Sequence, residues 1–165
     1  MKELVEFYSR VVSWNQRAGV KDHTFPTLDW SRAVELQTKL LVEESTEAYD
    51  SSKVDDYVGL LDGCIDNLVI AFKFVDMLDK AGFDIRGAFE AILENNDTKL
   101  YPSYYEAVEA KEKLEARDDV EYWIDTAVEN GVPWYCVKRE DGKITKGVDF
   151  KSVDISQYLS LIHIS

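Results

Sequence analysis

Cysteine, histidine and proline are all scarce in this chain of 165 residues. Its two cysteines, Cys64 and Cys136, are far apart and neither belongs to a Cys-x-x-Cys pair, so we interpret them as reduced thiols of a cytoplasmic protein. The two histidines, His23 and His163, lack the Glu-x-x-His spacing of di-iron bundles, and we reject both iron and zinc. Only three prolines interrupt the chain, which leaves room for long helices.

Positive charge is also in short supply. Asp and Glu number 32 against 19 Lys and Arg, which gives a net charge of −13. A chain this acidic repels nucleic-acid backbones and anionic membrane surfaces, so neither is an expected partner. Residues 60–78 form the longest apolar region, but four charged side chains within it exclude a membrane span. No secretion signal is recognisable at the start, and we expect a soluble cytoplasmic protein.

Apolar spacing predicts a mainly helical chain. The predicted helices cover about residues 3–18, 30–50, 54–80 and 85–95. Asp29 or Ser31 is expected to cap the second helix, and residues 51–53 are expected to form a turn.

The last third of the chain has a different character. Residues 102–130 are helical in composition but polar, and the runs 134–138 and 143–146 flank an Asp-Gly turn typical of a hairpin. The expected fold is therefore all-α: a four-helix-type bundle with a peripheral helical segment and a small C-terminal β-hairpin. We assign residues 1–100 to the bundle and residues 101–158 to an extension of the same domain.

Three glutamates continue the core-facing side of the second predicted helix. Glu43 and Glu47 extend a stripe that begins with Leu36 and Leu40. The neighbouring stripe comprises Gln37, Leu41, Glu44 and Ala48. Exposed glutamates normally occupy the polar face of a helix, so these three must be paired, protonated or bound to cations.

The third predicted helix carries Asp62 and Asp66 one turn apart, within an apolar run that extends from Leu60 to Phe72. Carboxylates brought together from two adjacent helices form a ligand set of oxygen atoms only. Hard cations prefer such ligands, and Mg²⁺ is the most available, with Mn²⁺ as a substitute. A purely structural alternative is that the glutamates are solvated and that Asp66 pairs with Lys39 or Lys73.

These residues also carry a family resemblance. The segment Glu43-Glu44-Ser45-Thr46-Glu47 resembles the Glu-Glu-x-x-Glu motif of the all-α nucleotide pyrophosphohydrolases, the MazG-like and dimeric dUTPase-like superfamily. The segment 62–68 resembles the second acidic motif of that superfamily, and the segment 96–100 resembles its Asn-x-Ser/Thr-Lys element. Residues 141–147 resemble the C-terminal extension of phage-type members, so the resemblance covers roughly residues 30–155.

The resemblance implies Mg²⁺-dependent hydrolysis of a nucleoside triphosphate between its α and β phosphates, giving the monophosphate and pyrophosphate. It also implies a homodimer or homotetramer. The implied metal ligands are Glu43, Glu44, Glu47, Asp62 and Asp66. Glu43 and Glu47 take the catalytic roles, and the attacking water lies near a second metal or is hydrogen-bonded to Glu43.

The resemblance further implies that Lys99 and Asn96 bind the phosphates or the sugar. From the residues alone, an ordinary helix C-terminus is the better explanation of both, and only the resemblance favours a binding role. One departure concerns the second motif, in which Gly63 stands where the superfamily has glutamate; Asp62 is expected to substitute for it. Residues 159–165 resemble a translated sequencing adapter and are expected to be non-native. The alternative function is a non-catalytic acidic bundle that binds a protein partner.

Overall fold

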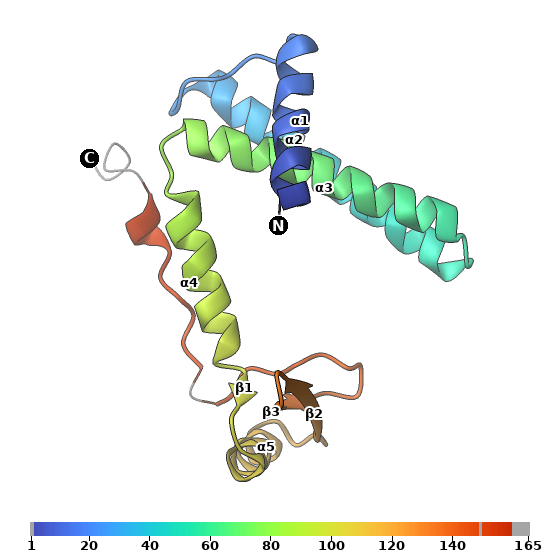
Figure 1. Cartoon of the computed structure of the whole chain (residues 1–165), viewed down its shortest axis with the longest axis vertical. Coiled ribbons are helices and arrows are strands. Elements are labelled where there is room, and N and C mark those ends of the chain that lie inside the picture. The colour runs from blue at the N-terminus through green and yellow to red at the C-terminus, as the bar shows by residue number, and fades with distance from the viewer. Residues whose placement is uncertain (1, 149, 160–165) are drawn as a thin grey trace. The chain divides into compact units, whose positions relative to one another are not determined.

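The computed structural model describes residues 2–148 and 150–159, and it divides into two compact units (Figure 1). Unit 1 comprises the residues up to Ile85 together with Leu159, and unit 2 comprises Arg86–Tyr158. Residues 160–165, which make up nearly all of the expected non-native tail and include His163, lie outside the described residues.

Unit 1 is built from three helices, α1 (Lys2–Arg17), α2 (Leu28–Lys53) and α3 (Tyr57–Lys80). Thr27 caps α2, because its Oγ1 accepts a hydrogen bond from the backbone N–H of Trp30 at 3.2 Å. The expectation that Asp29 or Ser31 caps this helix is therefore wrong. The turn expected at residues 51–53 is also wrong, since α2 continues through it.

The helices α2 and α3 are antiparallel and lie side by side (Figure 1). They are joined by residues 54–56, and Asp56 caps α3 by accepting from the backbone N–H of Gly59 at 3.0 Å. Helix α1 packs against α3, where the rings of Tyr8 and Phe72 meet edge to face with centroids 5.8 Å apart.

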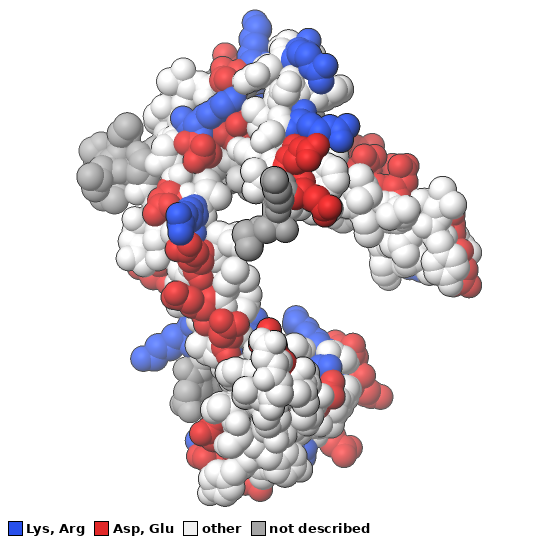
Figure 2. Space-filling view, in the orientation of Figure 1, with Lys and Arg blue, Asp and Glu red and all other residues white. Residues whose placement is uncertain are grey.

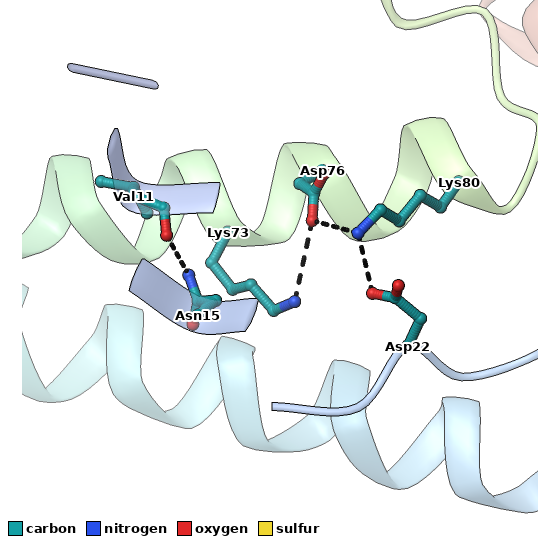
Figure 3. Close-up of polar contacts among 6 residues, drawn as sticks. All are labelled: Val11, Asn15, Asp22, Lys73, Asp76 and Lys80. Atoms are coloured by element: carbon teal, nitrogen blue, oxygen red, sulfur yellow. Dashed lines mark hydrogen bonds and ion pairs between the residues drawn. The ribbon is translucent and has the colours of Figure 1, made fainter. Parts of the chain in front are cut away.

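A buried ionic group fixes the C-terminal half of α3 (Figure 3). Lys73 and Asp76 are only 6% and 5% exposed, and Lys73 Nζ lies 3.7 Å from Asp76 Oδ2. Lys80 Nζ lies 3.1 Å from the same oxygen and 2.8 Å from Asp22 Oδ1, so it ties the loop after α1 to α3. Since a buried charge without a partner is costly, Lys73 and Asp76 depend on each other, and Asp76 also on Lys80.

Unit 2 combines helices with a small sheet. The helix α4 (Ile85–Asp97) leads into it, and α5 (Tyr104–Asp118) follows the short strand β1 (Leu100–Tyr101). The strands β2 (Trp123–Glu129) and β3 (Val132–Lys138) complete an antiparallel sheet of order β1-β3-β2.

The core of unit 2 forms where α5 packs on this sheet. Leu114, Tyr122 and Val137 are 0%, 4% and 1% exposed, and they come from α5, from the loop after it and from β3. Tyr101 and Ile124 pack against them from β1 and β2, so every element of the sheet contributes to this core.

Two expectations for residues 102–146 are corrected. Residues 123–129 form a strand and not part of a helix, and β2 pairs with β3 through a turn at Asn130 and Gly131, whose φ values are 51° and 80°. Two consecutive positive φ values are typical of a type I′ hairpin turn. The run 143–146 contributes only an isolated bridge between Ile144 and Lys138.

The chain is thus mostly helical with one small three-stranded antiparallel sheet, so the all-α prediction is confirmed in part. Among the described residues, no helix combines the length and the apolar content needed to cross a membrane.

Candidate functional site

The predicted acidic residues of α2 and α3 lie around the closest approach of these two helices. At the buried Gly63, a Cβ atom would lie 3.0 Å from the backbone nitrogen of Ala48 and 3.1 Å from the carbonyl oxygen of Glu44. Such distances are shorter than ordinary van der Waals contacts, so a side chain here would require the two backbones to shift by a few tenths of an ångström. Glycine at position 63 therefore allows the two backbones to touch beside the acidic residues.

A polar bond also joins the helices at this point. Ser45 Oγ donates to Asn67 Oδ1 at 2.9 Å, and Asn67 Nδ2 donates to the carbonyl oxygen of Gly63 at 2.9 Å. The amide of Asn67 is thus held at both ends, by α2 and by its own helix. The first bond links α2 to α3 beside the carboxylates, and the second, within α3, orients the Asn67 amide for it.

The two predicted stripes of α2 differ in where they lie. Ala48 is buried and Glu44 is half-buried, so the stripe to which they belong contacts α3. Glu43 and Glu47 are exposed, as are Asp62 and Asp66 on α3. One carboxylate therefore lies at the helix interface, and the others are open to solvent beside it.

Glu44 is the electrostatic centre of this group. Burial raises the pKa of its carboxyl group, and four neighbouring carboxylates raise it further: Glu47, Asp66, Glu43 and Asp62, in decreasing order. These are the five residues that the sequence nominated as cation ligands. We call them the acidic face of α2 and α3.

The structural alternative for Asp66 is not seen. Lys39 Nζ lies 2.6 Å from Glu35 Oε1, and Lys73 pairs with Asp76, so among the described residues neither lysine pairs with Asp66. Within residues 2–148 and 150–159, however, no three His, Cys, Asp or Glu side chains converge into a ready-made metal site. The donor set fits a hard cation by chemistry, because every donor is a carboxylate oxygen and four of the carboxylates act on the fifth, Glu44.

Asn96 and Lys99 belong to unit 2 and have contacts of their own. Asn96 is exposed near the end of α4, and Lys99 Nζ donates to its Oδ1. The Lys99 ammonium group also lies 6.0 Å from the centroid of the Phe150 ring. The structure thus brings these two residues together, and it places them in a different unit from the acidic face.

Two features of the site were missed in the sequence. The bond between Ser45 and Asn67 joins residues 22 positions apart, and nothing in their spacing identifies them as a pair. The role of Gly63 had a signal, since a glycine inside an apolar helix indicates close backbone packing.

No family model, curated protein or solved structure matches this chain. The evidence for a function therefore lies in the residues and contacts described above.

Proposed function

We propose that the acidic face of α2 and α3 binds Mg²⁺ and that the protein hydrolyses a nucleoside triphosphate to the monophosphate and pyrophosphate. The observation that supports this best is the raised pKa of Glu44, which reports four further carboxylates around one helix contact. Carboxylates on a surface normally spread apart or pair with lysines, so a mutually repelling group is costly unless cations relieve it. A triphosphate needs the same cations, because the chain has a net charge of −13.

In this proposal each acidic residue has a definite role. Glu44, Glu47 and Asp66 hold the cation, and Asp62 and Glu43 complete the set. Bound Mg²⁺, or Mn²⁺ as a substitute, supplies charge neutralisation and polarises a phosphoryl oxygen. A carboxylate oxygen of Glu43 accepts a proton from the attacking water. The water oxygen forms a bond to the α phosphorus as the bond to the α–β bridging oxygen breaks, and that oxygen leaves with pyrophosphate.

We also propose that unit 1 forms a homodimer or a homotetramer and that pairing completes a four-helix arrangement. Apolar side chains of α1 and α3 line a groove of about 730 Å³. Those exposed by 47–58% are Leu4, Phe7, Trp14, Ile65 and Leu68. Since Met77 is the one large apolar side chain of unit 1 among those described as buried, this unit gains stability when the groove is covered.

The same groove supports the second candidate function, a non-catalytic module that binds a protein partner through α1 and α3. Both candidates place the protein in the cytoplasm, where the free thiols of Cys64 and Cys136 are stable. They differ in whether nucleotides are consumed. A non-catalytic binding module would consume no nucleotide, whichever metal ion is present.

The test is product identification with the full chain and MgCl₂, over a panel of ribo- and deoxyribonucleoside triphosphates. We expect at least one substrate to give the monophosphate and pyrophosphate in equal amounts. Glu47→Gln should lower kcat by roughly a hundredfold or more, as with the loss of one electrostatic stabiliser. The matched control is Glu35→Gln on the same helix, which should leave kcat unchanged. Orthophosphate as the main product, or full activity of Glu47→Gln, would contradict the proposal.

A further inference from the structure

Unit 2 has a surface concavity that is lined by basic side chains, although the protein as a whole is acidic. Loop 139–148, the end of α5 and Lys99, which lies between α4 and β1, border a concavity of about 420 Å³. Its lining includes the five cationic side chains of Lys99, Arg117, Arg139, Lys143 and Lys146. We call it the basic concavity. Among the described residues of this lining, Asp118 is the one acidic residue, whereas acidic side chains are spread over both units on the face seen in Figure 2.

Arg117 is held in place by the core of unit 2. Its Nε and Nη2 both donate to Asp118, at 2.5 and 2.6 Å, and Asp118 Oδ2 also accepts from the hydroxyl group of the buried Tyr122 at 2.6 Å. These bonds hold the pKa of Asp118 at about 2, so the carboxylate stays charged across the usual pH range. The guanidinium group is therefore oriented before any ligand arrives.

The turn after β3 positions the next two cations. Arg139 Nη2 lies 2.6 Å from Asp141 Oδ2, and Asp141 Oδ1 accepts from the backbone N–H of Lys143 at 3.0 Å. The backbone N–H of Arg139 donates to the carbonyl oxygen of Lys143 at 3.0 Å, which closes the loop. Lys143 is thus fixed at its backbone, while its ammonium group has no carboxylate within ion-pair distance among the described residues.

Lys146 and Lys99 are brought together by one aromatic ring. Their Nζ atoms lie 4.4 and 6.0 Å from the centroid of the Phe150 ring. The two ammonium groups are therefore no more than about 10 Å apart. Within the described chain neither is neutralised by a carboxylate, so three lysines leave unpaired positive charge in a space that fits a small molecule.

We propose that the basic concavity binds a compact polyphosphate anion, namely inorganic pyrophosphate or the phosphate chain of a nucleotide. Several lysines can contact adjacent phosphates at once, and a held arginine adds directed donors. An extended polyanion such as RNA is disfavoured, because it would run onto the surrounding acidic surface. This inference does not rest on the function proposed for the acidic face.

The test uses the full chain in metal-free buffer of fixed ionic strength, where the acidic face repels anions. Titration calorimetry with inorganic triphosphate, pyrophosphate, a nucleoside triphosphate and orthophosphate should show saturable one-to-one binding, tighter for the polyphosphates than for orthophosphate. The Lys143→Gln/Lys146→Gln double variant should bind at least about tenfold more weakly, since each lost charge-assisted hydrogen bond to phosphate lowers the affinity by about tenfold or more.

The matched control is Lys39→Gln/Lys53→Gln, which removes the same charge from two exposed lysines of α2. It should change affinity by roughly twofold or less. Equal weakening in both double variants would overturn the proposal, because diffuse charge would then explain the binding. Absence of saturable binding, or much tighter binding of a single-stranded oligonucleotide, would overturn it too. Equal affinity for pyrophosphate and the nucleotide would support it and identify the diphosphate as the recognised group.

Discussion

Gly63 of α3 lies directly against Ala48 of α2, and a Cβ atom on the glycine would lie 3.0 Å from the backbone nitrogen and 3.1 Å from the Cβ of Ala48. The neighbouring contact, with the carbonyl oxygen of Glu44, is equally short. Because two of these three atoms belong to backbone, they cannot move aside as a flexible side chain does.

This contact predicts that Gly63→Ala destabilises unit 1, although alanine favours helices over glycine by about 1 kcal/mol. Overpacking should outweigh that gain and lower the free energy of unfolding by roughly 1–3 kcal/mol. Urea denaturation measures it. The control is Cys64→Ala, an exposed position one residue further along α3, which should have little effect. A stabilised Gly63→Ala variant would mean that the helices are further apart than described.

The electrostatic strain at Glu44 predicts a pH dependence of stability. The pKa of Glu44 is higher in the folded chain than in the unfolded chain, so the folded chain binds more protons at the same pH. The free energy of unfolding therefore falls as the pH rises above the ordinary glutamate pKa. Glu44→Gln should remove this fall and stabilise the metal-free protein at neutral pH. Melting curves between acidic and neutral pH measure the difference.

Glu35 on the same helix provides a control of opposite sign. Its hydrogen bond to Lys39 lowers its pKa, so its contribution is present above the ordinary glutamate pKa and is lost as pH falls. Glu35→Gln should therefore be neutral to slightly destabilising at neutral pH. If both substitutions stabilise the protein equally, a general reduction of negative charge would explain the result. The prediction that Glu44 is specifically destabilised by its neighbouring carboxylates would then be wrong.

The burial of Leu114 predicts that shortening its side chain destabilises unit 2. Leu114→Ala leaves a cavity between α5 and the sheet, and it should lower the stability of unit 2 by about 2–5 kcal/mol. The same substitution at Leu93 of α4, which is 49% exposed, should cost far less. Hydrogen exchange of the β3 amides measures both. Equal protection in the two variants would show that the core lies elsewhere.

The helices could be predicted from the sequence, whereas the sheet was predicted at the wrong residues although its strands carry a recognisable pattern. Apolar periodicity located α1, α3 and α4 to within a few residues. Residues 123–129 carry a strand pattern of aromatic and β-branched side chains, and Asn130-Gly131 is a strong type I′ signal. The Asp141-Gly142 turn favoured a hairpin of residues 134–138 and 143–146, whereas the hairpin is formed by residues 123–129 and 132–138.

The acidic face was nominated from the sequence because carboxylates at helical spacing share a face whatever the packing. Which stripe of α2 contacts α3 could not be decided, since Leu40 and Leu41 make both stripes look alike. In the structure, the stripe of Glu44 and Ala48 contacts α3, because Gly63 leaves room for close approach at these two residues. Likewise, Thr27 caps α2 although Asp29 and Ser31 are suitable residues. The cap is the residue at which the backbone changes from extended to helical, and here that residue is Thr27.

The roles proposed for the two aspartates predict unequal effects on catalysis. Asp66→Asn should abolish activity, because a principal ligand is lost. Asp62→Asn should mainly raise the Mg²⁺ concentration needed for half-maximal activity. Steady-state rates over a range of MgCl₂ concentrations measure both, and equal tolerance of the two substitutions would mean that the acidic side of α3 is structural.

The central claim is that the acidic face is one specific cation site, and melting curves in EDTA, MgCl₂ and NaCl of matched ionic strength test it most directly. A cation that binds only the folded state adds about 2.7 kcal/mol at a hundredfold excess over its Kd. For a chain of this size that raises the melting temperature by roughly 5–10 °C. We expect this rise with MgCl₂ alone, and its loss in Glu44→Gln and Glu47→Gln but not in Glu35→Gln. If NaCl reproduces the rise in the unmodified protein, Mg²⁺ only screens diffuse charge and the proposed site does not exist.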